Sequence, residues 1–160
     1  MTADELRCFL RDCFAVTDTE LFVGHGARLD DDLRDVGDEV RFAAFCTYEE
    51  GTGDFAMRLS VGIEGRLVAR VDRLEFARRF AARFDSYLLY GDNEPEPWLW
   101  TVIRPDGDRL YAVMAGDEDR LRLEAASGPI SGLPRLRVDP RLGPPTYGRW
   151  YLDHDRSPKR

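Results

Sequence analysis

The sequence predicts an α+β fold with a mainly antiparallel sheet of about five to seven strands and two helices packed on one face of it. Two segments place apolar residues at helical spacing behind a capping residue, which predicts two amphipathic helices. Two pairs of alternating segments are joined by links rich in turn-forming residues, which predicts two hairpins. The element order α-β-ββ-α-β-ββ has no βαβ repetition, so we do not expect a doubly wound parallel sheet.

The first helix has a clear start. Thr2 and Glu5 have capping-box spacing, in which each side chain accepts a hydrogen bond from the other residue's free amide. Residues 19–23 are then expected to form a short strand, and residues 24–39 a polar, aspartate-rich connection. The predicted buried stripe of the helix consists of Leu6, Phe9, Leu10, Cys13 and Phe14.

The first hairpin is the strongest structural prediction. In residues 40–48 and in residues 55–63 every second residue is hydrophobic, as in a strand with one buried face. Residues 49–54 between them are rich in acidic residues and glycine, which is typical of a hairpin turn. This pattern places Phe42 and Cys46 on the same face of the first strand. We therefore expect Cys46 to lie in the core.

A second hairpin is predicted from residues 97–103 and 109–114. The link between them contains Pro105, which pre-sets one turn dihedral, and Gly107, which accepts a positive φ. Residues 86–90 are expected to form a strand before this hairpin and residues 120–126 a further strand after it.

The second helix is predicted to open at Asp72, with Glu75 three residues later as a cap pair. Glu75 and Arg79 are spaced for an i,i+4 ion pair on its surface. Its predicted buried face consists of Leu74, Ala77, Phe80, Ala81 and Phe84.

The chain of 160 residues is long enough to bury a core as one domain. We expect residues 1–126 to form a single α+β domain and residues 127–160 a Pro/Gly-rich C-terminal segment, packed on that domain or partly extended. The acidic start does not resemble a signal peptide, and no apolar run approaches the roughly 20 residues of a membrane span. We therefore expect a cytoplasmic protein without a membrane partner.

The formal net charge is −7, and the charge is unevenly distributed. Residues 1–64 carry 15 acidic and 6 basic residues, and residues 91–119 carry 8 and 2, whereas the two remaining blocks are basic. An acidic total argues against a phosphate-binding surface and hence against nucleic acid as a partner.

No catalytic or cofactor motif is present: the sequence has no P-loop, dinucleotide fingerprint or nucleophile elbow. Cys8 and Cys13 point about 140° apart on the predicted helix, with Cys13 in the apolar stripe and Cys8 on the wetter side. His25 is close in sequence to an aspartate run, but one histidine is too few for ordinary zinc chemistry. We expect a protein that is not an enzyme and needs no cofactor or metal.

Three acidic loops and one tryptophan pair are the candidate partner-binding features. The acidic loops either provide solubility or steer a cationic partner onto the surface. The tryptophans either form core beneath a helix or, if that face is open, a platform for a partner. The predicted partner-binding residues are Asp30, Asp31, Asp32, Asp35 and Asp38 in the first loop, Glu49, Glu50 and Asp54 in the second, Asp92, Glu94 and Glu96 in the third, and Trp98 and Trp100.

Four short segments within residues 76–107, a stretch of roughly a fifth of the chain, carry a resemblance. They are Phe76-Ala77-x-x-Phe80-Ala81, Tyr87-Leu88-Leu89-Tyr90, Glu96-Pro97-Trp98-Leu99-Trp100 and Arg104-Pro105-Asp106-Gly107. With them, the short acidic chain resembles the small immunity proteins of bacterial polymorphic toxin systems, in particular actinobacterial ones. This resemblance implies a non-enzymatic inhibitor that neutralises a basic toxin or effector by direct binding.

Two other functions remain as alternatives. The order of a helix, three strands, a second helix and further strands also resembles secretion-chaperone-like folds, which implies a homodimer that holds effector segments in an acidic, aromatic-lined groove. A regulatory binding module would share these features. An unrecognised hydrolase ranks third, because paired carboxylates are abundant but do not single out an acid and a base.

Overall fold

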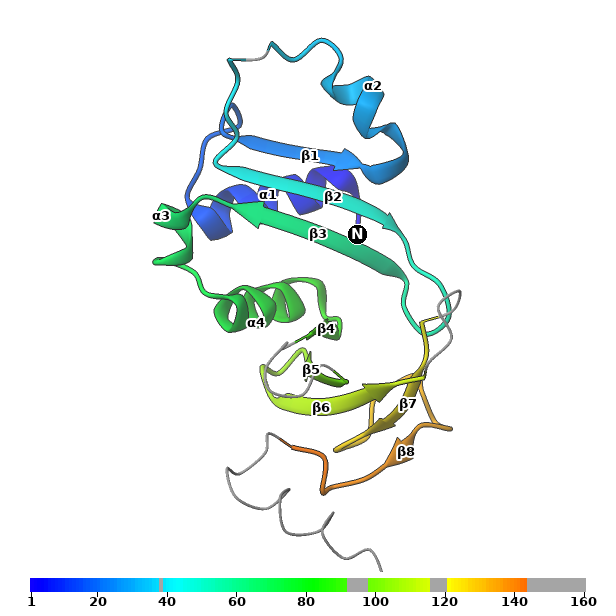
Figure 1. The fold of residues 1–160 in the computed structure, drawn as a ribbon. Coiled ribbons are helices and arrows are strands. Elements are labelled where there is room, and N and C mark those ends of the chain that lie inside the picture. Colours follow the sequence, from blue (N-terminus) through cyan, green and yellow to red (C-terminus); the bar gives the residue numbers. More distant parts are fainter. Residues whose placement is uncertain (38, 92–97, 116–120, 144–160) are drawn as a thin grey trace, which may run out of the picture.

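The computed structural model describes residues 1–37, 39–91, 98–115 and 121–143. The α+β class is confirmed, and most strand pairs are antiparallel (Figure 1). The strands do not form the single sheet expected from the sequence, however, but two sheets. The first has three strands in the order β1-β2-β3, and the second has five in the order β4-β5-β6-β7-β8.

Helix α1 (Ala3–Phe14) begins as predicted. The Thr2 hydroxyl accepts a hydrogen bond from the Glu5 amide at 3.2 Å, and the Glu5 carboxylate accepts one from the Thr2 amide at 2.7 Å. The helix ends at Ala15, which adopts the left-handed conformation with φ of 52°. All five apolar residues of the predicted stripe are buried against the first sheet.

The first sheet contains β1 (Leu21–His25), β2 (Ala44–Glu50) and β3 (Met57–Ile63). Strands β2 and β3 form the predicted antiparallel hairpin, whereas β1 pairs with β2 in parallel. A parallel pair needs a crossover connection, and this one contains a short 3-10 helix η1 (Gly26–Arg28) and helix α2 (Leu29–Leu33). The predicted polar connection is therefore partly helical.

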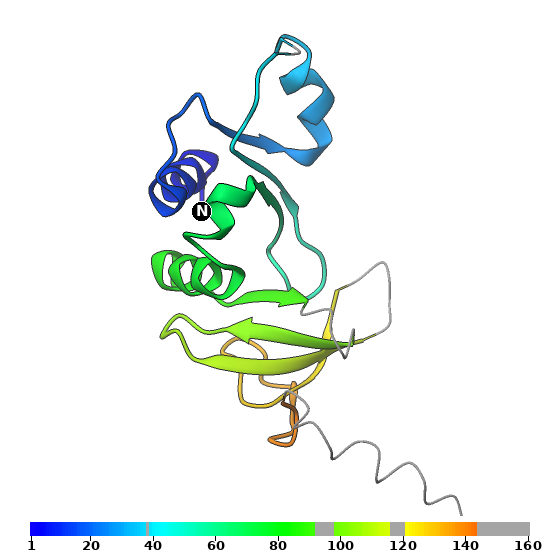
Figure 2. The same ribbon diagram turned by 60° about the vertical axis from the view of Figure 1, so that its left-hand side comes forward.

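Helix α4 (Arg73–Phe84) follows the short helix α3 (Gly65–Val68) and lies between the two sheets (Figures 1 and 2). The Asp72 side chain caps it by accepting from the Glu75 amide at 2.8 Å. One side of α4, with Phe80, packs into the core of α1 and the first sheet. An adjacent side, with Ala77 and Ala81, packs against Ile103 of the second sheet.

The second sheet receives α4 on one face and the C-terminal segment on the other. Ile130, Leu133 and Leu136 pack against Val102 and Ala112 on the face opposite α4. Residues 144–160 of the predicted C-terminal segment lie outside the described residues. The strands of this sheet are β4 (Leu88–Gly91), β5 (Leu99–Ile103), β6 (Arg109–Met114), β7 (Leu123–Ala126) and β8 (Arg137–Val138).

The predicted second hairpin is formed by β5 and β6. Gly107 in its turn has a φ of 86°, which an L side chain adopts only with strain, so the sequence identified this turn correctly. Strand β8 pairs with β7 in parallel and ends the described sheet. None of the helices in the described part of the chain is long and apolar enough to span a membrane.

Candidate partner-binding surface

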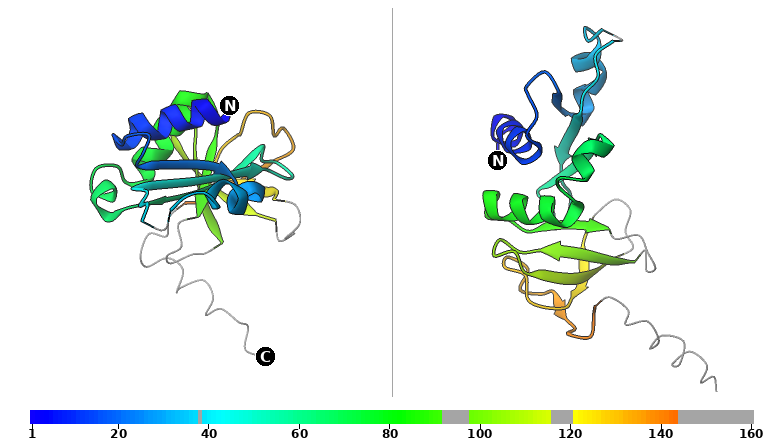
Figure 3. Two further views of the ribbon diagram at one scale, coloured as in Figure 1. Left: turned by 90° about the horizontal axis from the view of Figure 1, so that it is seen from above. Right: turned by 90° about the vertical axis from the view of Figure 1, so that its left-hand side faces the viewer.

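The first sheet has one covered face and one open face. Ala44 and Cys46 of β2 are buried in the core with α1, so the alternate residues point the other way. Figures 1 and 3 show α1 and α4 behind the sheet and no described helix over β2 and β3 on the opposite side. We call this side the outer face. It carries Phe45, Thr47 and Glu49 of β2 and Arg58, Ser60 and Gly62 of β3.

An aromatic cluster lies at one side of the outer face. The rings of Phe22 and Phe45 are stacked with their centroids 4.6 Å apart, and Phe42 lies 5.5 Å from Phe22. Phe22 is buried, whereas Phe42 and Phe45 are half-buried. The cluster therefore leaves apolar aromatic surface accessible.

Phe42 corrects a prediction made from alternation. The pattern of residues 40–48 placed Phe42 on the same face as Cys46, but Ala43 and Ala44 are both buried and β2 begins only at Ala44. Phe42 therefore joins the outer face, while Cys46 lies in the core as expected. The consecutive small residues Ala43 and Ala44 were the only sign in the sequence that the alternation of β2 begins at residue 44 and not at residue 40.

Two of the three predicted acidic loops come together where β1 and β2 end. A Cβ atom added to Gly26 would collide with the carboxylate of Glu49, so the chain after β1 lies directly against the end of β2. A Cβ atom on Gly24 would lie 3.3 Å from the carboxylate of Asp32 in α2. We call this region the acidic end of the first sheet. It consists of Asp30, Asp31, Asp32, Asp35, Glu49 and Glu50, with Arg28 and Arg34.

Only part of this acidic charge is compensated within the fold. Arg34 pairs with Asp31 at 2.7 Å, and Arg28 approaches Asp32 at 3.7 Å. The carboxylates of the other four acidic residues are exposed and form no ion pair with any described residue. These four are Asp30, Asp35, Glu49 and Glu50. Asp38 lies outside the described residues.

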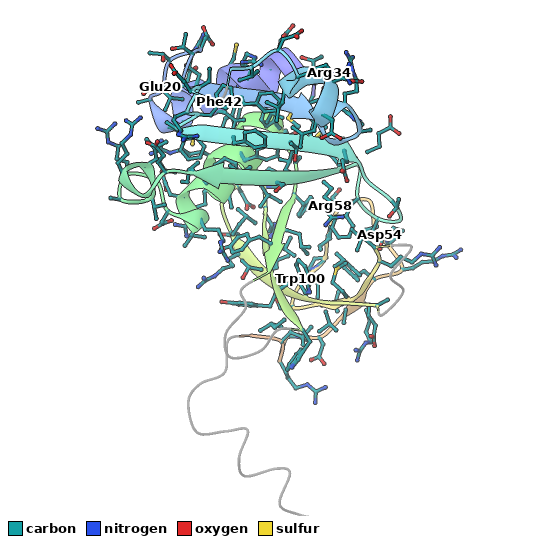
Figure 4. The ribbon with its side chains drawn as sticks, turned by 45° about the horizontal axis from the view of Figure 1, so that its top comes forward. Glu20, Arg34, Phe42, Asp54, Arg58 and Trp100 are labelled. Carbon is teal, nitrogen blue, oxygen red and sulfur yellow. The ribbon has the colours of Figure 1, made fainter. Side chains whose placement is uncertain are left out.

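The other end of the same sheet differs in its charge balance. Arg66 donates to Glu20 and to Glu64, each at 2.8 Å, so one guanidinium serves both carboxylates. Figure 4 shows Glu20 near this end and Arg34 near the acidic end. Glu20 and Glu64 at this end are thus paired, whereas four carboxylates at the acidic end have no ion-pair partner among the described residues.

Asp54, the third predicted residue of the second loop, has a role inside the fold. Its amide donates to the Leu121 carbonyl at 2.9 Å, and its carboxylate accepts from the Leu123 amide at 2.8 Å. Gly53 beside it has a φ of 69°, and a Cβ there would collide with the Leu121 carbonyl. The β2–β3 hairpin is thus docked on the second sheet, and Asp54 holds it there.

The tryptophans are not core beneath a helix. Trp100 shares its strand face with Val102, which packs against the C-terminal segment, whereas α4 covers the opposite face. Trp100 is half-buried and Trp98 is 41% exposed. The predicted third loop, with Asp92, Glu94 and Glu96, lies outside the described residues.

Helix α4, the second helix predicted from the sequence, is rich in arginine, and several of these arginines bond to other parts of the fold. Arg73 donates to the Gly91 carbonyl at 2.9 Å, and Arg78 donates to the Gly107 carbonyl at 3.4 Å. The predicted pair of Glu75 and Arg79 is present at 2.7 Å. The two contacts with backbone carbonyls fasten α4 to the end of β4 and to the turn between β5 and β6.

His25 and the three cysteines form no recognisable reaction centre with other described residues. The Nδ1 atom of His25 accepts from the Ala27 amide at 3.2 Å, so the neutral ring carries its proton on Nε2. Burial raises the pKa of the Cys46 thiol to about 12 and that of Cys13 above its ordinary value, while Cys8 is exposed. Within the described ranges, no group of three or more His, Cys, Asp and Glu side chains is arranged to hold a metal ion.

No family model matches the chain, and no curated protein or solved structure matches it. Sequence reasoning located the acidic residues of this surface but missed the adjoining phenylalanine cluster. Phe22 lies in a different strand from Phe45, and strict alternation placed Phe42 and Phe45 on opposite faces of the predicted strand, so no pattern in the sequence linked the three.

Proposed function

We propose that this protein is a non-enzymatic inhibitor of the immunity type, which binds a cationic toxin or effector through the acidic end and the adjoining outer face of its first sheet. The observation that carries the proposal is the uneven charge balance of that sheet. Arg66 pairs with Glu20 and Glu64 at one end, whereas Asp30, Asp35, Glu49 and Glu50 at the other end are exposed and have no basic partner among the described residues.

A group of exposed carboxylates favours binding of a cationic protein because it speeds up association. A field of like charge attracts an oppositely charged protein over distances of about 10 Å at 0.1 M salt and raises the rate of productive encounters. It also gives specificity, because a partner with an acidic surface would be repelled. A surface used only for solubility would not require the charge to be gathered at one end of one sheet.

The phenylalanine cluster offers the apolar contact area that a stable interface needs in addition to charge. Protein interfaces combine an apolar centre with a polar rim, and aromatic side chains are enriched at their centres. Phe42 and Phe45 expose aromatic surface on the same outer face that Glu49 borders. A cationic protein that spans the outer face would thus be attracted by the acidic end and held by apolar contact with Phe42 and Phe45, which lie toward Glu20 where β2 begins (Figure 4).

The test first establishes whether a toxin-like gene lies next to the gene for this chain, since a genome without one would count against the proposal. It then uses the product of that gene with its catalytic residue inactivated. Binding is measured for the wild-type protein and for the double variant Asp30→Lys, Asp35→Lys. Both residues are exposed and unpaired within the described residues, so the fold should tolerate the change. We expect the association rate constant to fall about tenfold or more.

A matched control changes the same amount of charge elsewhere. Asp12→Lys on α1 and Glu124→Lys on β7 alter two exposed carboxylates away from the acidic end. This control should bind nearly as fast as the wild type. An equal loss in both double variants would show that only net charge matters, and no binding by the wild-type protein would overturn the proposed function.

A further inference from the structure

The open part of the outer face lies over β2 and β3. On β1, a Cβ atom added to Gly24 would collide with the ring of Phe22 and lie 3.3 Å from the carboxylate of Asp32. On β3, a Cβ atom added to Gly62 would meet only the Phe45 carbonyl oxygen, at 4.0 Å, apart from its chain neighbours. Figure 3 shows this side of β2 and β3 without a described helix over it. Two strands occupy a width of about 10 Å, which is close to the diameter of one α-helix.

Phe45 offers one ring face to this open part. Phe22 stacks on the opposite face, with the two centroids 4.6 Å apart and the ring planes 15° apart. Phe42 lies 5.5 Å from Phe22 but 6.3 Å from Phe45, so it does not lie over the second face of the Phe45 ring. The guanidinium–ring contacts among the described residues involve other rings. The second face of Phe45 is therefore left for a partner.

Glu49, on the same strand, offers the charge. Its carboxylate leans toward β1, because a Cβ atom added to Gly26 would collide with it. Arg58 lies opposite Glu49 in the ladder with β3, is exposed and forms no ion pair with any described residue. A cationic group can therefore approach Glu49 from the β1 side, where the other carboxylates of the acidic end lie, and stay away from Arg58.

These contacts have a definite spacing along β2. Phe45 and Glu49 are four residues apart, which corresponds to about 13 Å of strand. On a helix, the residue seven positions later returns to the same face after a rise of about 10.5 Å, and a long basic side chain spans the remainder. The separation of 6.3 Å between the rings of Phe42 and Phe45 is close to the rise of about 6 Å over four more helical residues. A basic residue followed by apolar residues seven and eleven positions later would match all three side chains.

We propose that the outer face takes one amphipathic helix of the partner, aligned with β2, with basic residues over Glu49 and apolar residues over Phe45 and Phe42. A helix suits a sheet face because its backbone groups are already paired, whereas a single extended segment laid on the face would bury unpaired N–H and C=O groups. Its basic residues complement the four exposed carboxylates of the acidic end. This inference rests on the proposed function and specifies which part of the partner makes the contact.

The probes are two synthetic helical peptides of about 16 residues. Both are rich in alanine and glutamine and are held helical by a covalent link between two side chains that belong to neither the arginine nor the leucine positions. The matched peptide has two arginines four residues apart, and leucines seven and eleven residues after the second arginine. The shifted peptide has the same composition, but its leucines follow that arginine by five and nine residues, which places them on the other side of the helix.

Binding of each fluorescently labelled peptide to the full chain is measured by anisotropy. The matched peptide should bind at least about tenfold more tightly, because only its leucines can be buried on the phenylalanines while its arginines lie over the acidic end. Equal affinity of the two peptides would show that charge alone decides binding and would overturn the inference. Absence of binding by the matched peptide would overturn it as well.

A variant of the protein locates the contact. Ser60→Arg places a long cationic side chain in the open part and should weaken the matched peptide at least about tenfold. Ser131→Arg is the matched control, because Ser131 is equally exposed, lies on the second sheet's side of the molecule and gives the same net charge. This control should bind like the wild type, and equal affinity of the two variants would overturn the inference. Neither peptide is taken from the toxin-like protein, so failure of this inference is distinguishable from failure of the proposed function.

Discussion

The contact of Asp54 with the second sheet gives the sharpest prediction about the fold. In Asp54→Ala the hydrogen bond from the Leu123 amide to the carboxylate is lost, while the bond from the residue 54 amide to the Leu121 carbonyl can remain. A hydrogen bond of this kind contributes about 1 kcal/mol net. For a chain of 160 residues, that corresponds to a decrease in Tm of about 2–4 °C.

Thermal unfolding followed by circular dichroism measures this effect. Glu50→Ala is the matched control, because it also removes a carboxylate from this hairpin. The Glu50 carboxylate is exposed and has no ion-pair partner among the described residues. Asp54→Asn keeps an acceptor oxygen and should lie between wild type and Asp54→Ala. If Asp54→Ala and Glu50→Ala had the same Tm, the assignment of Asp54 to the fold would be refuted.

Two further predictions concern titratable groups. A thiol reagent under native conditions should label Cys8 alone at neutral pH, since Cys13 and Cys46 are buried and their pKa values are raised; three labelled thiols in the native protein would contradict this. Hydrogen bonds from Thr17 lower the pKa of Glu20 below its ordinary value of 4.5, so its stabilising effect is present above that pH and is lost as the pH falls further. The stability difference between wild type and Glu20→Gln, from urea unfolding, should therefore shrink on acidification; a difference that grows would contradict the assignment.

The parts of the fold predicted correctly from sequence are those with local causes. The capping box of Thr2 and Glu5, the cap at Asp72 and the glycine turn at Gly107 each depend on residues within a few positions of one another. The β2–β3 hairpin is also local, since its two strands are consecutive and separated by a short link. Such elements are specified by spacing alone.

The division into two sheets could not be predicted in this way, because it depends on contacts between distant segments. The one available signal was the breadth of the apolar surface of α4. Ala77 and Ala81 lie on a different side of that helix from Phe76 and Phe80, and a helix with two apolar sides can pack between two layers. The sequence pattern was interpreted as a single buried face, which led to a single sheet.

The candidate site was predicted in part for a similar reason. Acidic residues are visible in a sequence, but whether they are compensated is a property of the fold. Asp31 has Arg34 three residues away and is paired locally, whereas Glu20 depends on Arg66, which is distant in sequence. Asp54 looked like the other loop carboxylates and differs from them only through its contact with Leu123.

The central claim is that the acidic end attracts a cationic protein partner. The most direct measurement is the association rate constant with the inactivated toxin-like protein, at salt concentrations between about 0.05 and 0.5 M. We predict a steep fall with salt for the wild type and a much shallower one for Asp30→Lys, Asp35→Lys, with convergence at high salt because screening removes the steering. Equal salt dependence in the two proteins would contradict the claim.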